Sequence, residues 1–101
     1  MNIPENGFYV HYKHDPSGEP YNYMYEVAGI ARNTEEKTYS VLYRPLYKND
    51  WFPPSTYQSR PLDMFMENVE RDGEIIPRFK RVTDPVLIAE LESVREEMYG
   101  A

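Results

Sequence analysis

Residues 23–44 read YMYEVAGIARNTEEKTYSVLYR, and this stretch decides the fold. Tyrosine and valine, which favour strands, alternate with other residues on both sides of the polar segment 32–37. A short polar segment between two such runs is typical of a hairpin. Both faces of the first run are apolar in its middle, as in a strand covered on both sides in a small barrel. We therefore expect two antiparallel strands here.

Strand-like alternation is also present in residues 8–13 and 75–82. In the first of these, His11 and Lys13 are two residues apart, which places them on the same face of a strand. Between the strands we expect a loop at residues 14–20, an irregular segment at 47–59, a helical turn at 61–65 and a tight turn at Asp72-Gly73.

The clearest single element is a helix that begins after Asp84. Asp84 is a favourable capping residue, and Pro85 suits the first helical position. An apolar stripe follows at helical spacing, consisting of Leu87, Leu91, Val94 and Met98. We expect this stripe to pack against the sheet rather than to bind a partner.

Composition predicts one mainly β domain, a roll over residues 1–83 with the helix of residues 84–101 packed on it. The 101 residues are 41% hydrophobic, enough for one core. The chain has no cysteine, which favours a reducing compartment and a cytoplasmic location. No stretch is apolar for long enough to span a membrane.

The charge is unevenly distributed along the chain. Its net value is −6, which argues against strong nonspecific binding to nucleic acid or to anionic lipid. Residues 84–101 carry a net −4, so residues 1–83 hold only −2. A local basic pocket is therefore compatible with the acidic total.

Several phrases of the sequence resemble one family. They occupy residues 7–13 (GFYVHYK), 25–32 (YEVAGIAR), 41–44 (VLYR), 60–65 (RPLDMF) and 77–79 (PRF). Together they are similar to the bacterial domain of unknown function 1653 (DUF1653). The resemblance implies a roll of strands similar to an SH3-type barrel, and it implies no activity.

The chain also departs from this pattern. Residues 33–36 read NTEE where the family usually has His-Ser-Glu-Thr, and Gln58-Ser59 stand where it has Trp-Val. The loops at residues 14–22 and 47–57 look longer than in the family. We interpret the chain as a member of a diverged branch.

Seven charged residues are candidates for a shared site. His11 and Lys13 lie on one expected strand, Glu26 and Arg32 share a face of the next by alternation, and the other three are arginines near the ends of elements. Arginine binds carboxylate or phosphate bidentately, and histidine exchanges a proton near neutral pH. Such a set suits an anionic small molecule, a nucleotide or a peptide, held by His11, Lys13, Glu26, Arg32, Arg44, Arg60 and Arg78. The alternative is that these charges face solvent around a barrel, with Glu26 paired to an arginine.

A catalytic role is the second interpretation, and the sequence favours it less than binding. His11 and Glu26 are the one pair that the strand pattern brings together for acid–base chemistry on an anionic substrate. The chain has no nucleophile elbow, phosphate-binding glycine loop or metalloprotease helix motif. His11 and His14 are three residues apart, which does not favour a metal site on a strand, so we expect neither metal nor cofactor.

A third interpretation is a structural or interaction subunit, and exposed aromatic residues would serve both this role and a binding or adaptor module for a peptide. Proline-rich peptides and nucleic-acid bases are bound by exposed aromatic residues on small barrels. The aromatic residues most apt to form such a patch for a protein partner are Trp51, Phe52 and Tyr57.

Overall fold

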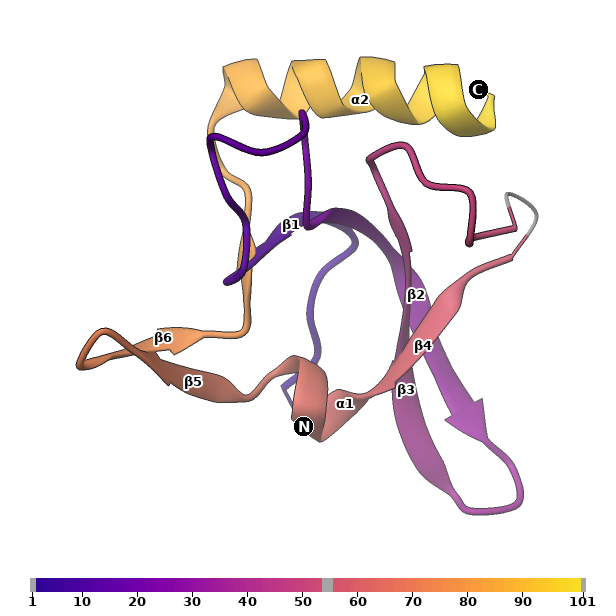
Figure 1. Ribbon diagram of the computed structural model, residues 1–101. Helices are drawn as coiled ribbons and strands as arrows, with labels where there is room; N and C mark the ends of the chain where they lie inside the picture. Colours follow the sequence, from indigo (N-terminus) through magenta and orange to yellow (C-terminus); the bar gives the residue numbers. More distant parts are fainter. Residues whose placement is uncertain (1, 54–55, 101) are drawn as a thin grey trace.

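The computed structural model describes residues 2–53 and 56–100 (Figure 1). Its strands are β1 (Gly7–His11), β2 (Met24–Asn33), β3 (Thr38–Pro45), β4 (Gln58–Pro61), β5 (Asn68–Arg71), β6 (Glu74–Pro77) and β7 (Phe79–Arg81). Its helices are α1 (Leu62–Phe65) and α2 (Pro85–Tyr99).

The main sheet has five antiparallel strands in the order β4-β3-β2-β1-β7. It curls into a half-barrel, and α2 lies across one side of it, at the top of Figure 1. Strands β5 and β6 form a separate two-stranded hairpin that projects from the body. The mainly β architecture of antiparallel strands with one C-terminal helix is confirmed.

The predicted hairpin is formed by β2 and β3, whose register runs from Tyr25 opposite Pro45 to Asn33 opposite Thr38. Its turn is held by the Asn33 side chain, whose Oδ1 accepts hydrogen bonds from the N–H groups of Glu35 and Glu36, each at 3.0 Å. Such local side-chain bonds favour a turn over continued pairing.

A β-bulge changes which residues of β2 share a face. Val27 pairs with Tyr43 and Gly29 with Leu42, so Ala28 is the extra residue. Beyond the bulge, Ile30 packs on the same core as Val27. The alternation predicted that Glu26 and Arg32 share a face; this is wrong, because the bulge reverses the alternation.

Two other expected boundaries also differ from the structure. The expected strand 75–82 is two strands, since β6 pairs with β5 whereas β7 pairs with β1. The break is at Arg78, whose N–H donates to the Glu67 carbonyl and whose carbonyl accepts from Tyr12, both at 3.0 Å. In addition, β4 begins at Gln58, within the segment that we expected to be irregular, and it pairs with β3.

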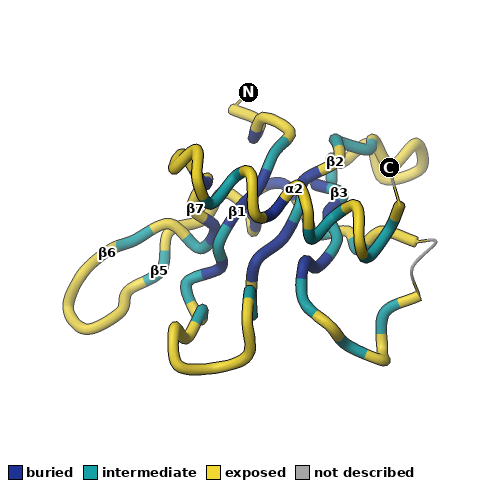
Figure 2. The backbone as a smooth tube through the Cα atoms, turned by 90° about the horizontal axis from the view of Figure 1, so that it is seen from above, coloured by how far each residue is buried: buried dark blue, intermediate teal, exposed yellow. Residues whose placement is uncertain are grey.

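The sheet separates two cores. The concave side holds Tyr9, Tyr25, Val27, Val41, Tyr43, Leu62, Phe65 and Phe79. The core on the α2 side consists of Phe8, Met24, Leu46, Val82 and Leu91. Adjacent residues of β1 therefore belong to different cores, and the central strands are buried while the β5–β6 hairpin is exposed (Figure 2).

The predicted start of α2 and three of the four residues of its apolar stripe are confirmed, whereas Met98 lies outside the core. The Asp84 side chain accepts a hydrogen bond from the Val86 N–H, and Pro85 is the first helical residue. Leu91 is fully buried, and Leu87 and Val94 pack against the same core. No helix in the described residues combines the length and the apolar character needed to span a bilayer.

We expect Phe65→Ala to lower the free energy of unfolding by about 3 kcal/mol or more, because the fully buried ring stacks on Phe79 at 4.2 Å between centroids. Met64→Ala, in the same helical turn but exposed, is the matched control and should change stability by less than about 1 kcal/mol. Urea unfolding followed by tyrosine fluorescence measures both values. Equal losses in the two variants would contradict the placement of Phe65.

Candidate functional site

The structure divides the seven predicted site residues between the two sides of the sheet. Glu26 and Arg44 lie on the side of α2, opposite one another on β2 and β3. His11 and Arg60 contact Phe79 of the concave core, and Arg78 is near enough to His11 for its charge to lower the pKa of the imidazole. Arg32 is exposed near the far end of the β2–β3 hairpin. The seven residues therefore do not form one pocket.

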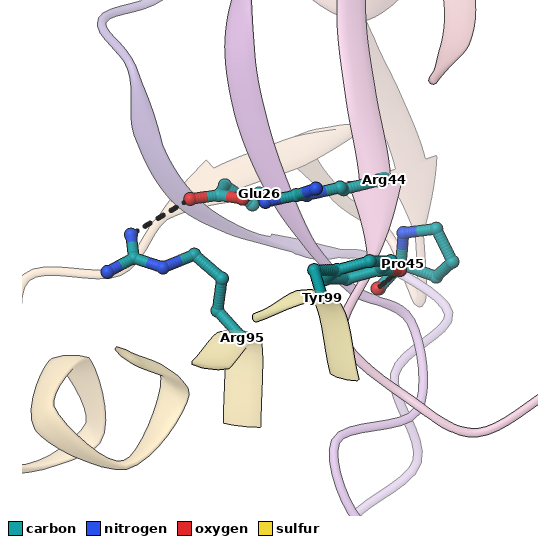
Figure 3. Close-up of polar contacts among 5 residues, drawn as sticks. All are labelled: Glu26, Arg44, Pro45, Arg95 and Tyr99. Atoms are coloured by element: carbon teal, nitrogen blue, oxygen red, sulfur yellow. Dashed lines mark hydrogen bonds and ion pairs between the residues drawn. The ribbon is translucent and has the colours of Figure 1, made fainter. Parts of the chain in front are cut away.

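Glu26 is the centre of a charged clamp between the sheet and α2 (Figure 3). Its Oε1 accepts from Arg44 Nε at 2.9 Å, and its Oε2 accepts from Arg95 Nη1 at 3.0 Å. Only 13% of the Glu26 side chain is exposed. We call Glu26, Arg44 and Arg95 the Glu26 clamp; both oxygens of the carboxylate are used within it.

Tyr99, one turn after Arg95, extends the contact between α2 and the sheet. Its hydroxyl donates to the Pro45 carbonyl, and its ring centroid lies 4.0 Å from the Arg44 guanidinium carbon. A guanidinium over an aromatic face is attracted by the ring. The Glu26 clamp thus holds α2 against the sheet. It agrees with the alternative from the sequence analysis, in which Glu26 pairs with an arginine.

The sequence analysis missed Arg95. The signal was present, because Leu91, Arg95 and Tyr99 follow one another at intervals of four residues and so lie on one helix face. A single cation in line with the buried stripe of an otherwise acidic helix indicates a buried partner. Hydrogen bonding to Glu26 raises the pKa of Arg95 above its ordinary value.

His11 is buried on the other side of the sheet, with 7% of its surface exposed. Its ring packs against Tyr23 at 5.5 Å and against the edge of Phe79 at 4.9 Å between centroids. Its Nδ1 accepts a hydrogen bond from the Lys13 N–H at 3.1 Å, so the neutral ring carries its proton on Nε2. Burial lowers the pKa of His11 to about 4, and the nearby cations Arg60, Arg78 and Lys13 add to this effect.

The alternation predicted that His11 and Lys13 share a face, and this is wrong. Strand β1 ends at His11, and the chain turns directly after it, with the His14 N–H donating to the His11 carbonyl at 2.9 Å. Lys13 is exposed while His11 is buried. Lys13 therefore contributes its charge to the surroundings of His11 from the surface.

Arg60 and Arg78 supply the positive charge beside His11. Arg60 Nε donates to the Tyr43 hydroxyl at 3.3 Å, and its guanidinium carbon lies 5.5 Å from the Phe79 ring centroid. Arg78 Nη2 is 3.6 Å from Glu67 Oε2, beyond hydrogen-bond distance. We call the group of His11, Arg60, Arg78, Tyr43 and Phe79 the basic–aromatic site.

One donor of this site is unsatisfied. Arg78 Nε is buried and has no hydrogen-bond partner among residues 2–53 and 56–100. Buried donors are nearly always bonded to protein or water, and a charged donor without an acceptor is especially unfavourable. An oxygen atom of water or of a ligand would satisfy this nitrogen once a small movement of the Arg78 side chain brings the two into contact.

His11 and Glu26 are not brought together for acid–base chemistry. Glu26 is paired in register with Phe8, whose side chain belongs to the core under α2, whereas His11 contacts Phe79 of the concave core. The sheet itself separates the two side chains. Their predicted proximity is wrong, because they lie on opposite faces.

The structure also places the remaining candidates. His14 Nδ1 lies 2.6 Å from the Asn22 carbonyl oxygen. Within the described residues, no three His, Asp or Glu side chains are grouped closely enough to hold a metal ion. Trp51 and Tyr57 are exposed, and Phe52 is half-buried against Trp51 at 6.0 Å between centroids.

Fold and site together define a small curled β domain with a basic–aromatic site on its concave side. The model of a family described as protein of unknown function, DUF1653, matches residues 7–81, and the chain belongs to this family. The crystal structure of a DUF1653 protein from Bordetella bronchiseptica is 31% identical, with a TM-score of 0.61 over 77% of this chain and 86% of that chain. Among curated proteins there is no significant match.

The matched residues include the whole basic–aromatic site, and α2 follows them. Arg95 therefore lies outside the part of the chain that the family model describes, whereas Glu26 and Arg44 lie inside it.

We expect Glu26→Gln to lower the free energy of unfolding by about 2 kcal/mol, between the values for exposed and buried pairs, because it leaves two guanidinium groups without their counter-charge. Glu90→Gln, the same change at an exposed position on α2, is the control and should leave stability within about 0.5 kcal/mol of the wild type. Urea denaturation at pH 7 measures both. Identical midpoints for the two variants would show that the clamp does not hold α2.

Stability should rise with pH between about 4 and 6.5 because of His11. The unfolded chain binds a proton at this residue near the ordinary pKa of 6.5, whereas the folded chain binds it only near 4. The contribution is complete above pH 6.5, and about 3 kcal/mol is lost as the pH falls through this window. Unfolding of wild type and His11→Gln at several pH values isolates it; a stability difference that is independent of pH would contradict a neutral, buried His11.

Proposed function

We propose that the chain is a binding domain for an anionic ligand, whose carboxylate or phosphate oxygens are held at the basic–aromatic site. The observation that carries this proposal is the buried, unpartnered Nε of Arg78. It is a donor with a fixed direction, a positive charge and no acceptor from the described chain. An oxyanion satisfies both its charge and its hydrogen bond.

The groups around this nitrogen suit the same ligand. Arg60 uses its Nε on Tyr43, which leaves its terminal nitrogens available as donors, and His11 presents a proton on Nε2. A site made of donors selects acceptors, and carboxylates and phosphates are the acceptors that match the planar guanidinium group.

The surroundings make these charges effective. Phe79 and Tyr43 are buried beside Arg60, so the charge of this arginine acts next to apolar rings rather than in bulk water. Electrostatic interactions are stronger where the local dielectric constant is low. A region of positive potential thus exists on a chain whose total charge is −6.

The carboxylate of Glu67 competes with an anionic ligand for Arg78. Its Oε2 lies 3.6 Å from Arg78 Nη2, and its side chain is 52% exposed. At this distance it weakens the positive charge of the guanidinium without accepting a hydrogen bond. A ligand that uses Nε and Nη2 together displaces this loose contact.

The contacts favour binding over catalysis. His11 Nδ1 is occupied by a backbone N–H rather than oriented by a carboxylate, and Glu26 lies across the sheet. A general base needs a group that orients it and a route to the proton. We further infer an SH3-like roll acting in the cytoplasm, which suits a curled antiparallel sheet in a chain without cysteine.

Arg78→Gln should weaken the binding of inorganic phosphate, acetate or adenosine 5′-monophosphate about tenfold, because a charged hydrogen bond is lost. Lys80→Gln removes the same charge from an exposed position on β7 and is the matched control. Titrations followed by ¹H–¹⁵N NMR give the affinities. In the wild type, the bound anion should also raise the pKa of His11 from its lowered value.

If the two variants weaken every anion equally, the effect is general screening, and the proposal fails. It fails as well if no anion moves the resonances of residues 11, 60 and 78, since ordered water alone then satisfies Arg78.

Glu67→Gln should tighten the binding of the same anions about threefold, because it removes a negative charge that repels the anion and competes with it for Arg78. Glu70→Gln, also exposed and three residues further along, serves as the control and should change affinity much less. The NMR titration used for Arg78 measures both variants. Weaker binding after Glu67→Gln would show that Glu67 positions Arg78 instead of competing for it.

A further inference from the structure

A groove runs beside the C-terminal end of α2, between the helix and two loops. It consists of two adjoining hollows of about 620 Å³ and 530 Å³, which share Glu19, Lys48 and Met98 as lining residues. One loop precedes β2 and the other follows β3. They correspond to the segments 14–22 and 47–57, which look longer than in the family. The groove is thus made of three parts of the chain that meet only in the folded state.

The floor of the groove is apolar. Leu46 is fully buried beneath it, Tyr47 and Val94 form its walls, and Met98 is half-buried in both hollows. Methionine adapts its shape to different apolar partners and is common on surfaces that bind them. Phe52 lines one end, and the exposed Trp51 contacts it there, so that the apolar surface continues outward.

The rim of the groove is negatively charged. Among the described residues that line it, three are acidic, Glu19, Asp50 and Glu97, and one is basic, Lys48. The last turn of α2 contains no basic residue, so its carbonyl groups add the negative end of the helix dipole. The potential at this groove is therefore opposite in sign to that of the basic–aromatic site.

We propose that this groove binds an apolar segment of a partner protein whose apolar side chains are flanked by lysine or arginine. Charge complementarity selects the occupant: the floor takes the apolar side chains, and the carboxylates of the rim attract the flanking cations. Anionic lipid and nucleic acid are repelled by the same rim. A second copy of this acidic chain is repelled in the same way.

Two synthetic twelve-residue peptides test the proposal, one with leucine at helical spacing among lysines and the other with glutamate in place of lysine. Trp51 is the single tryptophan of the chain and lies at the edge of the groove, so its fluorescence reports occupancy. We expect the leucine–lysine peptide to bind and the leucine–glutamate peptide to bind at least about tenfold more weakly.

Variants distinguish attraction by the carboxylates at the rim of the groove from attraction by the net charge of the chain. The double change Glu19→Lys with Glu97→Lys should weaken the leucine–lysine peptide about tenfold. Glu35→Lys with Glu36→Lys alters the net charge equally, in the exposed turn between β2 and β3, and should weaken it by about twofold or less. Met98→Ala should weaken it about fivefold through the lost apolar contact.

The proposal is overturned if the two double variants weaken binding equally, or if the two peptides bind alike. It is also overturned if NMR shifts caused by the leucine–lysine peptide map to residues 11, 60 and 78 instead of the groove. A concentration-dependent mass that Met98→Ala abolishes would identify the occupant as a second copy of the chain and would equally overturn it.

Discussion

The carboxylate of Glu26 is a charge placed between a sheet and a helix, and the position of α2 depends on how that charge is compensated. A carboxylate so little exposed to water is stable only with close counter-charges, which Arg44 supplies from β3 and Arg95 from the helix. Because Arg95 must reach Glu26, α2 is fixed in rotation. Leu91 then points into the second core, and Val94 and Met98 line the groove.

The clamp also explains the separation of charge in the molecule. One acid and two arginines are paired in it on the α2 side. On the concave side, the described residues give Arg78 one loose counter-charge, Glu67, and give Arg60 no ion pair. Positive charge therefore remains where the rings are buried. The acids of α2 and the loops, by contrast, remain at the surface around the groove. Two surfaces of opposite sign follow from a single arrangement of strands and helix.

Features set by near neighbours could be predicted from the sequence, and features set by distant contacts could not. The Asn33 turn, the Asp84 cap and the helical turn at Leu62–Phe65 depend on residues a few positions apart, and all three were expected at these places. The bulge at Ala28 and the break at Arg78 depend on pairing across the sheet. For the site, the seven candidates were predicted as one set, and the structure divides them. The position of Arg32 near the far end of the β2–β3 hairpin, the early end of β1 and the sheet itself separate Arg32, Lys13 and Glu26 from His11.

The half-barrel is open, and its two outer strands must therefore resist pairing with another molecule. Strand β4 has four residues and ends in Pro61, which has no N–H to offer, and β7 has only three residues. Lys80 and Arg81 are exposed on β7, and Arg81 is held at 2.7 Å by Glu5. Short edges with proline and charge are poor templates for intermolecular sheet growth. The open half-barrel thus has edge strands that protect it against aggregation.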